Sequence, residues 1–328
     1  MHINNKNLSK KILSWYDNNK RTLPWRVSQN SRKKQYYRLL SEFMLQQTQV
    51  KTVIPYFLKF VKKIPNLKTL STTKEKSILK LWEGLGYYRR ARNLHKTAKI
   101  LIKDYNGKLP QTIEELKKLP GIGEYTANAL LALVYDQPAI PVDGNVNRIF
   151  LRLFNKNIKK NIKKIYSNRN ADFAEALMEF GAIICKPKKP LCNICNLKKE
   201  CKFYSGCFYI KKKIKSITQE RRYDIFCYLN KKREIALTKN KKLTFLNNYK
   251  MPEIQKKTSY KNLKKYGWNY LSNYKNNISN IKMNIKLFYK FTNHMPKNFS
   301  WHSIDRLENE FIPSFTKKIF KKISKVYI

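Results

Sequence analysis

The sequence predicts a mainly α protein, in which a large helical domain is followed by a smaller α+β domain. Apolar residues recur at helical spacing through residues 8–210, strand-like runs begin only after residue 222, and five of the six cysteines gather between Cys185 and Cys207. The 328 residues, 42% of them hydrophobic and 13% aromatic, can bury two cores, which excludes wholesale disorder. We expect a helical domain at 1–210, a basic linker at 211–221 and a second domain at 222–328.

Apolar periodicity and helix-breaking residues mark the predicted helices in order. Stripes of helical spacing run through residues 39–47 and 53–61, and Thr112 followed by Glu115 is a capping box that opens the helix 113–119. The other predicted helices span residues 77–82, 91–102, 125–135, 149–154 and 173–184. In the second domain we expect strands at 223–229, 234–238, 243–246 and 285–291, and a helix at 315–323.

The charge of the chain favours a polyanionic partner. Lys and Arg number 70 against 21 Asp and Glu, a formal net charge of +49, which would attract nucleic acid or an anionic membrane surface. We assign part of the excess to A/T-rich codon usage, because Asn, Ile and Tyr are abundant as well. No run approaches the roughly 20 apolar residues of a spanning helix, and residues 1–20 lack a signal-peptide core, so we expect a cytoplasmic protein.

Four cysteines have the spacing of metal ligands. Cys185, Cys192, Cys195 and Cys201 form C-x6-C-x2-C-x5-C, which suits a tetrahedral zinc ion or a cubane iron–sulfur cluster, and incidental thiols are the third interpretation. Cys207 could replace one ligand, but we expect it to be free. The loop that they enclose also carries lysines that would suit DNA phosphates: Lys186, Lys188, Lys189, Lys198 and Lys199.

Residues 119–123, LPGIG, indicate a helix-hairpin-helix motif. Gly121 and Gly123 would allow tight backbone geometry, and the N–H groups that open the next helix could bind a phosphate. An ordinary turn between helices is the alternative. Asp143 follows in the segment 142–148, VDGNVNR. It could simply cap the next helix, or its carboxylate could stabilise positive charge developing on a sugar, with Arg148 holding a backbone phosphate.

These residues occur in an order that resembles the MutY family of adenine DNA glycosylases, within the helix-hairpin-helix superfamily. Besides the hairpin, VDGNV and the four cysteines, the motifs are SEFMLQQTQV at 41–50, GLGYY at 84–88 and RARNLH at 90–95. The resemblance is strong over residues 8–205 and weak over 222–328. It implies a helix-hairpin-helix glycosylase fold with an iron–sulfur cluster loop, a [4Fe-4S] cluster on the four cysteines, and a small C-terminal α+β Nudix-like domain.

The resemblance also implies the activity: removal of adenine mispaired with 8-oxoguanine or guanine in duplex DNA. Glu42 matches the general acid that protonates N7 of the flipped adenine, and Asp143 matches the carboxylate that faces C1′. Without the motif, Glu42 would be read as a surface acid paired with Arg38 one helical turn earlier. Tyr125 and Asn145 match residues beside Asp143. The residues that match the lining of the adenine pocket are Arg21, Trp25, Leu45 and Glu175. Those that match the group that fills the gap and reads the opposite base are Gln46, Gln47 and Tyr87. Without the resemblance, Trp25, Leu45 and Tyr87 could be ordinary core residues.

Tyr125 separates this chain from the endonuclease III pattern, in which a lysine at this position attacks the sugar. A phenol cannot form an imine, so we expect a monofunctional glycosylase. The chain departs from the family at residues 26–40, which look longer than usual, at Leu39, where Trp is common, and at residues 291–294, where FTNH replaces the Phe-Ser-His tip that touches 8-oxoguanine. A Nudix box is absent, so we expect no pyrophosphatase activity.

Two other functions fit parts of the sequence. One is an endonuclease III-like pyrimidine glycosylase with lyase activity, against which Tyr125, Glu42 and the additional domain argue. The other is a non-catalytic iron–sulfur DNA-binding regulator, which would not need Glu42 and Asp143 together. We expect a monomer, of bacterial and nucleoid-associated type, that binds mispaired duplex DNA and no membrane.

Overall fold

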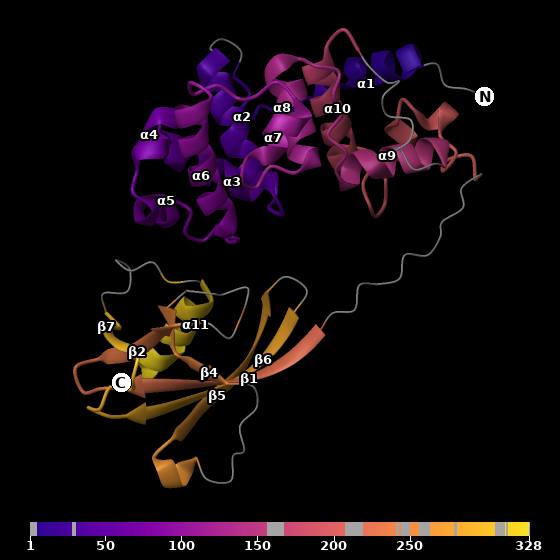
Figure 1. Ribbon diagram of the computed structural model, residues 1–328. Helices are drawn as coiled ribbons and strands as arrows, with labels where there is room; N and C mark the ends of the chain where they lie inside the picture. The colour runs from indigo at the N-terminus through magenta and orange to yellow at the C-terminus, as the bar shows by residue number, and fades with distance from the viewer. Residues whose placement is uncertain are drawn as a thin grey trace. The chain divides into compact units, whose positions relative to one another are not determined.

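The computed structural model describes residues 5–27, 31–155, 167–206, 219–240, 243, 250–255, 263–278, 281–305, 312 and 314–327. The chain forms two compact units, Met1–Lys212 and Lys213–Ile328, one helical and one built on a sheet (Figure 1). None of the described helices is both long and apolar enough to span a membrane.

Helices account for the regular structure of the first unit, apart from short 3-10 turns. They are α1 (Asn5–Asn19), α2 (Ser31–Leu45), α3 (Val50–Lys63), α4 (Leu67–Thr72), α5 (Glu75–Leu81), α6 (Arg89–Asp104), α7 (Ile113–Lys118), α8 (Glu124–Tyr135), α9 (Gly144–Phe154) and α10 (Asn170–Ile183). The capping box is confirmed, because the Thr112 hydroxyl accepts the Glu115 N–H at 3.4 Å at the start of α7. The helices predicted from periodicity are likewise present, with shifted ends.

The helix α10 is central to the first unit, since α1, α8 and α9 all pack against it. Its apolar side chains Phe173, Leu177 and Phe180 are buried with Leu8 and Ile12 of α1 and with apolar residues of α9. A helix enclosed on several sides is usually apolar all round. Glu175 and Glu179, two acids inside α10, are therefore unusual, being 5% and 2% exposed.

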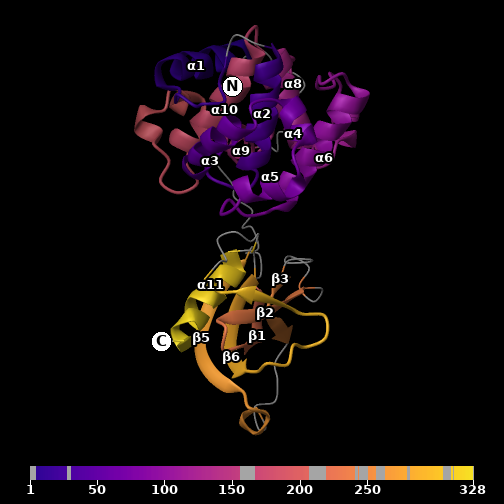
Figure 2. The same cartoon turned by 90° about the vertical axis from the view of Figure 1, so that its left-hand side faces the viewer.

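The second unit is a mixed sheet with a helix against it. Its elements are β1 (Gln219–Leu229), β2 (Glu234–Lys239), β3 (Lys250–Met251), β4 (Glu253–Gln255), β5 (Asn269–Ile278), β6 (Ile281–Phe291), β7 (Ser300–Ser303) and α11 (Ser314–Ile323). The order is β3-β2-β1-β6-β5, with β4 paired to β1 and β7 to β2. The pair β1–β6 is parallel and the others are antiparallel. Phe315, Ile319 and Ile323 of α11 are buried, and Figure 2 shows this helix beside the sheet.

The strands differ from the sequence-based prediction in three places. The long strand β5 and the short β3, β4 and β7 were not predicted. The strand expected at 243–246 lies outside the described residues except for Leu243, which is not in a strand. Residues 219–221, the end of the expected linker, belong to β1, while Cys207 and residues 211–218 lie outside the described part. The domain boundaries given above stay a prediction.

Candidate active site

Glu42 lies near the end of α2, with its side chain turned inward. It is 4% exposed, so it is not the surface acid that local pairing with Arg38 would suggest. Burial raises the pKa of Glu42 to about 7; the positive charge of Arg38 opposes this, Glu175 and Asp143 add to it, and a hydrogen bond with Tyr125 opposes it. Its Oε2 atom is buried without a hydrogen-bond partner in the described ranges. At neutral pH the protonated and ionised forms of Glu42 are therefore both well populated.

Asp143 caps the first turn of α9. Its Oδ1 accepts the N–H groups of Asn145 at 2.8 Å and Val146 at 2.7 Å, and its Oδ2 accepts the Asn145 side-chain amide at 2.8 Å. The local reading of Asp143 as a helix cap is therefore confirmed. The cap fixes the carboxylate at the positive end of the helix dipole, a position that favours negative charge. Capping and a catalytic role are thus compatible in one residue.

Tyr125, in the first turn of α8, joins the two acids. Burial and then the charges of Glu42 and Asp143 raise the pKa of its hydroxyl well above the ordinary value, so the phenol stays neutral. The hydroxyl also donates to Sδ of Met178 at 3.4 Å. Residues from α2, α8 and the start of α9 are thus close enough to influence one another, although they lie about 80 and 20 positions apart in the chain.

A close approach of two helices positions Asn145. A Cβ atom on Gly181 of α10 would lie 2.6 Å from the Cβ of Asn145, so only glycine fits there. Arg148 completes the arrangement: its guanidinium donates to Asn145 Oδ1 at 2.8 Å and to the carbonyls of Gly181 at 2.7 Å and Cys185 at 2.8 Å. These donors are engaged within the protein. The phosphate contact suggested for Arg148 stays a prediction.

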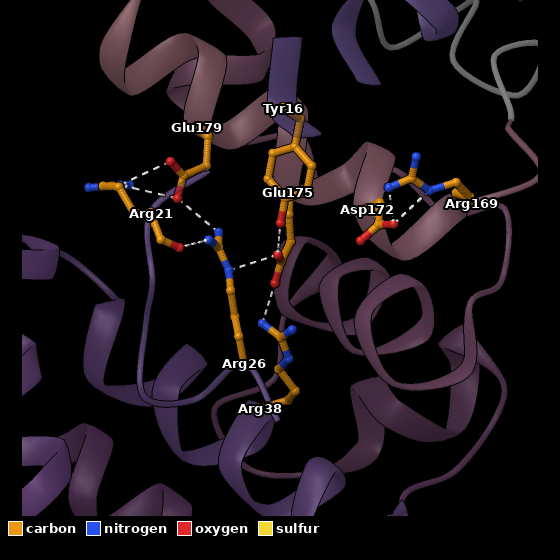
Figure 3. Close-up of polar contacts among 8 residues, drawn as sticks. All are labelled: Tyr16, Arg21, Arg26, Arg38, Arg169, Asp172, Glu175 and Glu179. Atoms are coloured by element: carbon orange, nitrogen blue, oxygen red, sulfur yellow. Dashed lines mark hydrogen bonds and ion pairs between the residues drawn. The ribbon is translucent and has the colours of Figure 1, made fainter. Parts of the chain in front are cut away.

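A buried ionic network surrounds Glu175 (Figure 3). Its carboxylate forms ion pairs with Arg26 at 2.7 Å and with Arg38, and it accepts a hydrogen bond from the Tyr16 hydroxyl. Burial alone would raise the pKa of Glu175, but Arg38, Arg26 and Tyr16 outweigh burial and hold the pKa below its ordinary value. Glu175 is therefore ionised at neutral pH.

A second acid one turn later extends this network. Glu179 accepts from Nε of Arg21 at 3.1 and 3.0 Å and from Nη2 of Arg26 at 2.8 Å. Arg21 and Glu175 were predicted from the sequence to be site residues, whereas Tyr16, Arg26 and Glu179 were not, and Arg38 was considered only as a partner of Glu42. The signal that could have found them was the pair of acids, four residues apart, among the otherwise apolar residues 173–183 of α10.

The other residues assigned to the adenine pocket and the opposite base lie in two settings. Trp25 is 3% exposed and packs edge-on against Phe57 at 5.3 Å, a core position in this conformation. Leu45 and Gln46 are half-buried at the end of α2. Gln47 and Tyr87 are exposed, and both have left-handed backbone conformations, with φ of 57° and 48°.

The hairpin glycines differ in their structural demands. Gly121 has φ of 85°, and a Cβ there would lie 2.8 Å from Phe43 and 2.9 Å from Asn93, so the turn requires glycine. Gly123 precedes α8 with open space around it and leaves the N–H groups of that helix accessible. The Gly121 carbonyl accepts Nε2 of Gln46 at 3.3 Å, which ties the hairpin to the end of α2.

Three of the four cysteines, Cys185, Cys195 and Cys201, pack against the core of α1, α9 and α10. Cys185, Cys192, Cys195 and Cys201 are half-buried and form no disulfide. Burial and the neighbouring thiols raise the pKa of Cys195 to about 11, so these thiols are close neighbours. In the described part of the chain, no three His, Cys, Asp or Glu side chains converge as ligands of one metal ion would. Four thiolates form the donor set of a tetrahedral zinc ion and of an iron–sulfur cluster alike.

Comparison with known proteins places this geometry in a family. Residues 40–172 match the model of the HhH-GPD superfamily of base excision DNA repair proteins. The chain is 36% identical over 351 residues to an adenine DNA glycosylase of Buchnera aphidicola subsp. Baizongia pistaciae, covering 96% of both chains. It is 39% identical over 210 residues to the adenine DNA glycosylase of Mus musculus, covering 59% of this chain and 41% of the mouse protein.

Solved structures share the fold of the helical unit. A thermostable thymine-DNA glycosylase is 29% identical, with a TM-score of 0.56, and the match covers 62% of this chain and 97% of that one. A trapped endonuclease III–DNA covalent intermediate is 23% identical, with a TM-score of 0.52, and covers 63% of this chain and 99% of that one. The second likeness is one of fold alone.

Proposed function

The chain belongs to the adenine DNA glycosylase family, and on that premise we propose that Glu42 and Asp143 are the acid and the charge-stabilising carboxylate of its reaction. It is a base excision repair enzyme that removes adenine from DNA. The observation that carries the assignment is the meeting of two carboxyl groups in opposite states: Glu42 buried with a raised pKa, and Asp143 bound by three hydrogen-bond donors. Pairs of this kind divide acid and charge-stabilising roles in glycoside hydrolysis.

The proton and the charge then have defined sources. Protonated Glu42 donates its proton to N7 of the extruded adenine, which lets the base leave as a neutral molecule. The sugar that remains has oxocarbenium character at C1′, and the carboxylate of Asp143 stabilises it until a water molecule adds to C1′ and loses a proton, which leaves the abasic sugar. Asn145 holds Asp143 in place. Arg21, Trp25, Leu45 and Glu175 line the adenine pocket, where the ionised Glu175 can accept a hydrogen bond from the amino group of adenine.

The reaction ends at base release. Tyr125 presents a neutral phenol where a lyase would need an amine, so the sugar–phosphate backbone stays intact until alkali cleaves it. The proposed substrate is adenine opposite 8-oxoguanine or guanine. Gln46, Gln47 and Tyr87 contact the opposite base and the gap, and Gly121, Gly123 and Arg148 serve DNA binding.

The proposed cofactor is a [4Fe-4S] cluster on Cys185, Cys192, Cys195 and Cys201. The neighbouring thiols and their lack of disulfides support it. The cluster would fix the loop that carries Lys198 and Lys199 against DNA phosphates. Iron and acid-labile sulfide assays on the purified protein should find about four of each per chain. One bound zinc and no sulfide would contradict the proposal.

The second unit is proposed to be the Nudix-like domain that reads 8-oxoguanine. Its expected tip, residues 291–294, follows β6, where Phe291 is 46% exposed and its ring meets that of Tyr327 at 5.4 Å. The Thr292 hydroxyl accepts the His294 N–H at 3.0 Å and forms a compact turn. An exposed aromatic beside an exposed histidine suits contact with a base.

Single-turnover reactions on two labelled duplexes test the function. One carries adenine opposite 8-oxoguanine and the other thymine glycol, and each is divided between alkali treatment and borohydride trapping. Alkali-dependent breaks at the adenine without trapped protein are expected. Cleavage at thymine glycol with trapped protein would indicate an endonuclease III-like enzyme instead, and binding without any break would indicate a regulator.

A further inference from the structure

Arg90 is a buried cation without a carboxylate partner among the described residues. It lies in the first turn of α6, 6% exposed, and burial lowers its pKa to about 10. Burying a cation is unfavourable unless other groups compensate for its lost hydration. The buried arginines near Glu175 have carboxylates, whereas Arg90 has only neutral oxygens. The hydrogen bonds of the Arg90 guanidinium indicate what this buried charge does in the structure.

Two separate segments supply those oxygens. At the end of α2, the carbonyls of Phe43, Met44 and Gln46 accept from Nη1 at 3.2, 2.6 and 2.5 Å. In the loop before α6, the carbonyls of Leu85 and Gly86 accept from Nη2 at 3.2 and 3.1 Å. A positive charge is favourable at the C-terminal end of a helix, where the carbonyls lack partners within the helix. One guanidinium thus joins the end of α2 to the glycine loop.

The joined segments carry the two exposed side chains in left-handed conformations. Gln47 is the second residue after the end of α2, and Tyr87 follows Gly86. Such conformations are strained in residues other than glycine and persist only when surrounding contacts hold them. The guanidinium carbon lies 5.5 Å from the ring centroid of Tyr87 and 5.5 Å from that of Trp82. It therefore contacts one of the two side chains and fixes the backbone beside both.

We propose that Arg90 is a positioning residue that sets Gln47 and Tyr87 at the spacing needed to enter the duplex where adenine is extruded. This rests on the proposed function, because it specifies how the residues that fill the gap are held. Arginine is required rather than any cation, since only its planar fork reaches carbonyls of two segments at once. Without it, both side chains keep their chemistry but lose their mutual placement.

The test compares Arg90→Lys and Arg90→Met with Arg92→Lys. Arg92 is on the same helix and pairs with Glu75 at 3.0 Å on the surface, so its variant controls for loss of an arginine. The affinity of each full-length protein is measured for a duplex with a tetrahydrofuran abasic analogue opposite 8-oxoguanine and for a fully matched duplex. Thermal melting and iron content identify protein that is folded and loaded.

The ratio of the two dissociation constants is the decisive readout. We expect both Arg90 variants to reduce the preference for the abasic duplex about tenfold or more, with affinity for matched duplex changed less than about twofold, and Arg92→Lys to retain it. A merely structural role would lower melting temperature without moving this ratio in the folded fraction. If Arg90→Lys binds like the native protein, charge alone suffices and the inference is wrong; Arg90→Met with a native ratio overturns it as well. Failure of the native protein to release adenine would instead refute the proposed function.

Discussion

Glu42 and Asp143 belong to one site, but their surroundings are opposites. Glu42 lies inside α2, 4% exposed, with a hydrogen bond to the Tyr125 phenol and with an Oε2 atom that has no partner among the described residues. Asp143 precedes α9, half-buried, with two backbone N–H groups and an amide on its oxygens. The first setting retains a proton and the second accommodates a charge. The difference shows how two carboxyl groups can be given distinct chemistry by position alone.

Glu175 sharpens the same contrast. It is as buried as Glu42, yet Arg26, Arg38 and Tyr16 keep it ionised. Burial alone therefore does not raise the pKa of a carboxyl enough for it to act as a general acid. The carboxyl must also lack a direct ion pair with an arginine, such as those that Glu175 forms. Arg38 lies one turn before Glu42 but forms its ion pair with Glu175. The predictions below test whether these settings determine the roles.

Removal of the proton donor should have the largest effect. Glu42→Gln keeps the shape of the side chain but cannot donate a catalytic proton, so we expect single-turnover adenine release to fall about a thousandfold or more. Glu124→Gln, an exposed acid in the first turn of α8, is the matched control. DNA affinity should stay within about twofold. Release within tenfold of the native rate would remove Glu42 from the role of acid.

Removal of the charge at Asp143 should cost slightly less. Asn can still accept the N–H groups that cap α9, so Asp143→Asn keeps the fold but loses the charge that faces C1′. We expect adenine release to fall about a hundred- to a thousandfold, with binding retained. Glu124→Gln, which removes the charge of an exposed acid in the first turn of α8, controls for loss of charge here as well. Persistent release by Asp143→Asn would show that the catalytic assignment is wrong.

The contrast between Glu42 and Asp143 could be predicted only in part. Periodicity and capping residues predicted the helices, and the Asp-Gly-Asn segment predicted a cap, because these signals are local. The network of Tyr16, Arg26 and Glu175 was not predicted, since it joins α1, the loop before α2, and α10 across about 150 residues. Likewise β5, rich in Asn and Tyr, looks polar and irregular by itself and is defined by its pairing with β6.

The pH dependence of release should follow Glu42. Its pKa of about 7 means that the acid is protonated below this value, so release should be constant below pH 7 and fall up to tenfold per pH unit above it. Arg38→Met removes a charge that lowers this pKa, while Arg26 still holds Glu175, so the midpoint should move upward by about one pH unit. Single-turnover rates from pH 5 to 9 measure both. A midpoint near the ordinary value for glutamate would contradict the burial argument.

The smallest expected effect concerns Tyr16, which tests how much a hydrogen bond to the ionised Glu175 contributes to stability. Its hydroxyl donates to the charged Glu175, whereas that of Tyr135 donates to the neutral carbonyl of Leu109. Hydrogen bonds to charged groups are the stronger kind, so Tyr16→Phe should lower the free energy of unfolding by about 1.5–3 kcal/mol and Tyr135→Phe by about 1 kcal/mol. Denaturant melts of the two variants compare them. Because Arg26 and Arg38 still hold Glu175 ionised, Tyr16→Phe should leave adenine release within about threefold of the native rate. A fall in the adenine-release rate well beyond threefold in folded Tyr16→Phe protein would contradict this expectation. It would mean that Tyr16 helps to define the adenine pocket and that the charge of Glu175 depends on more than its two arginines.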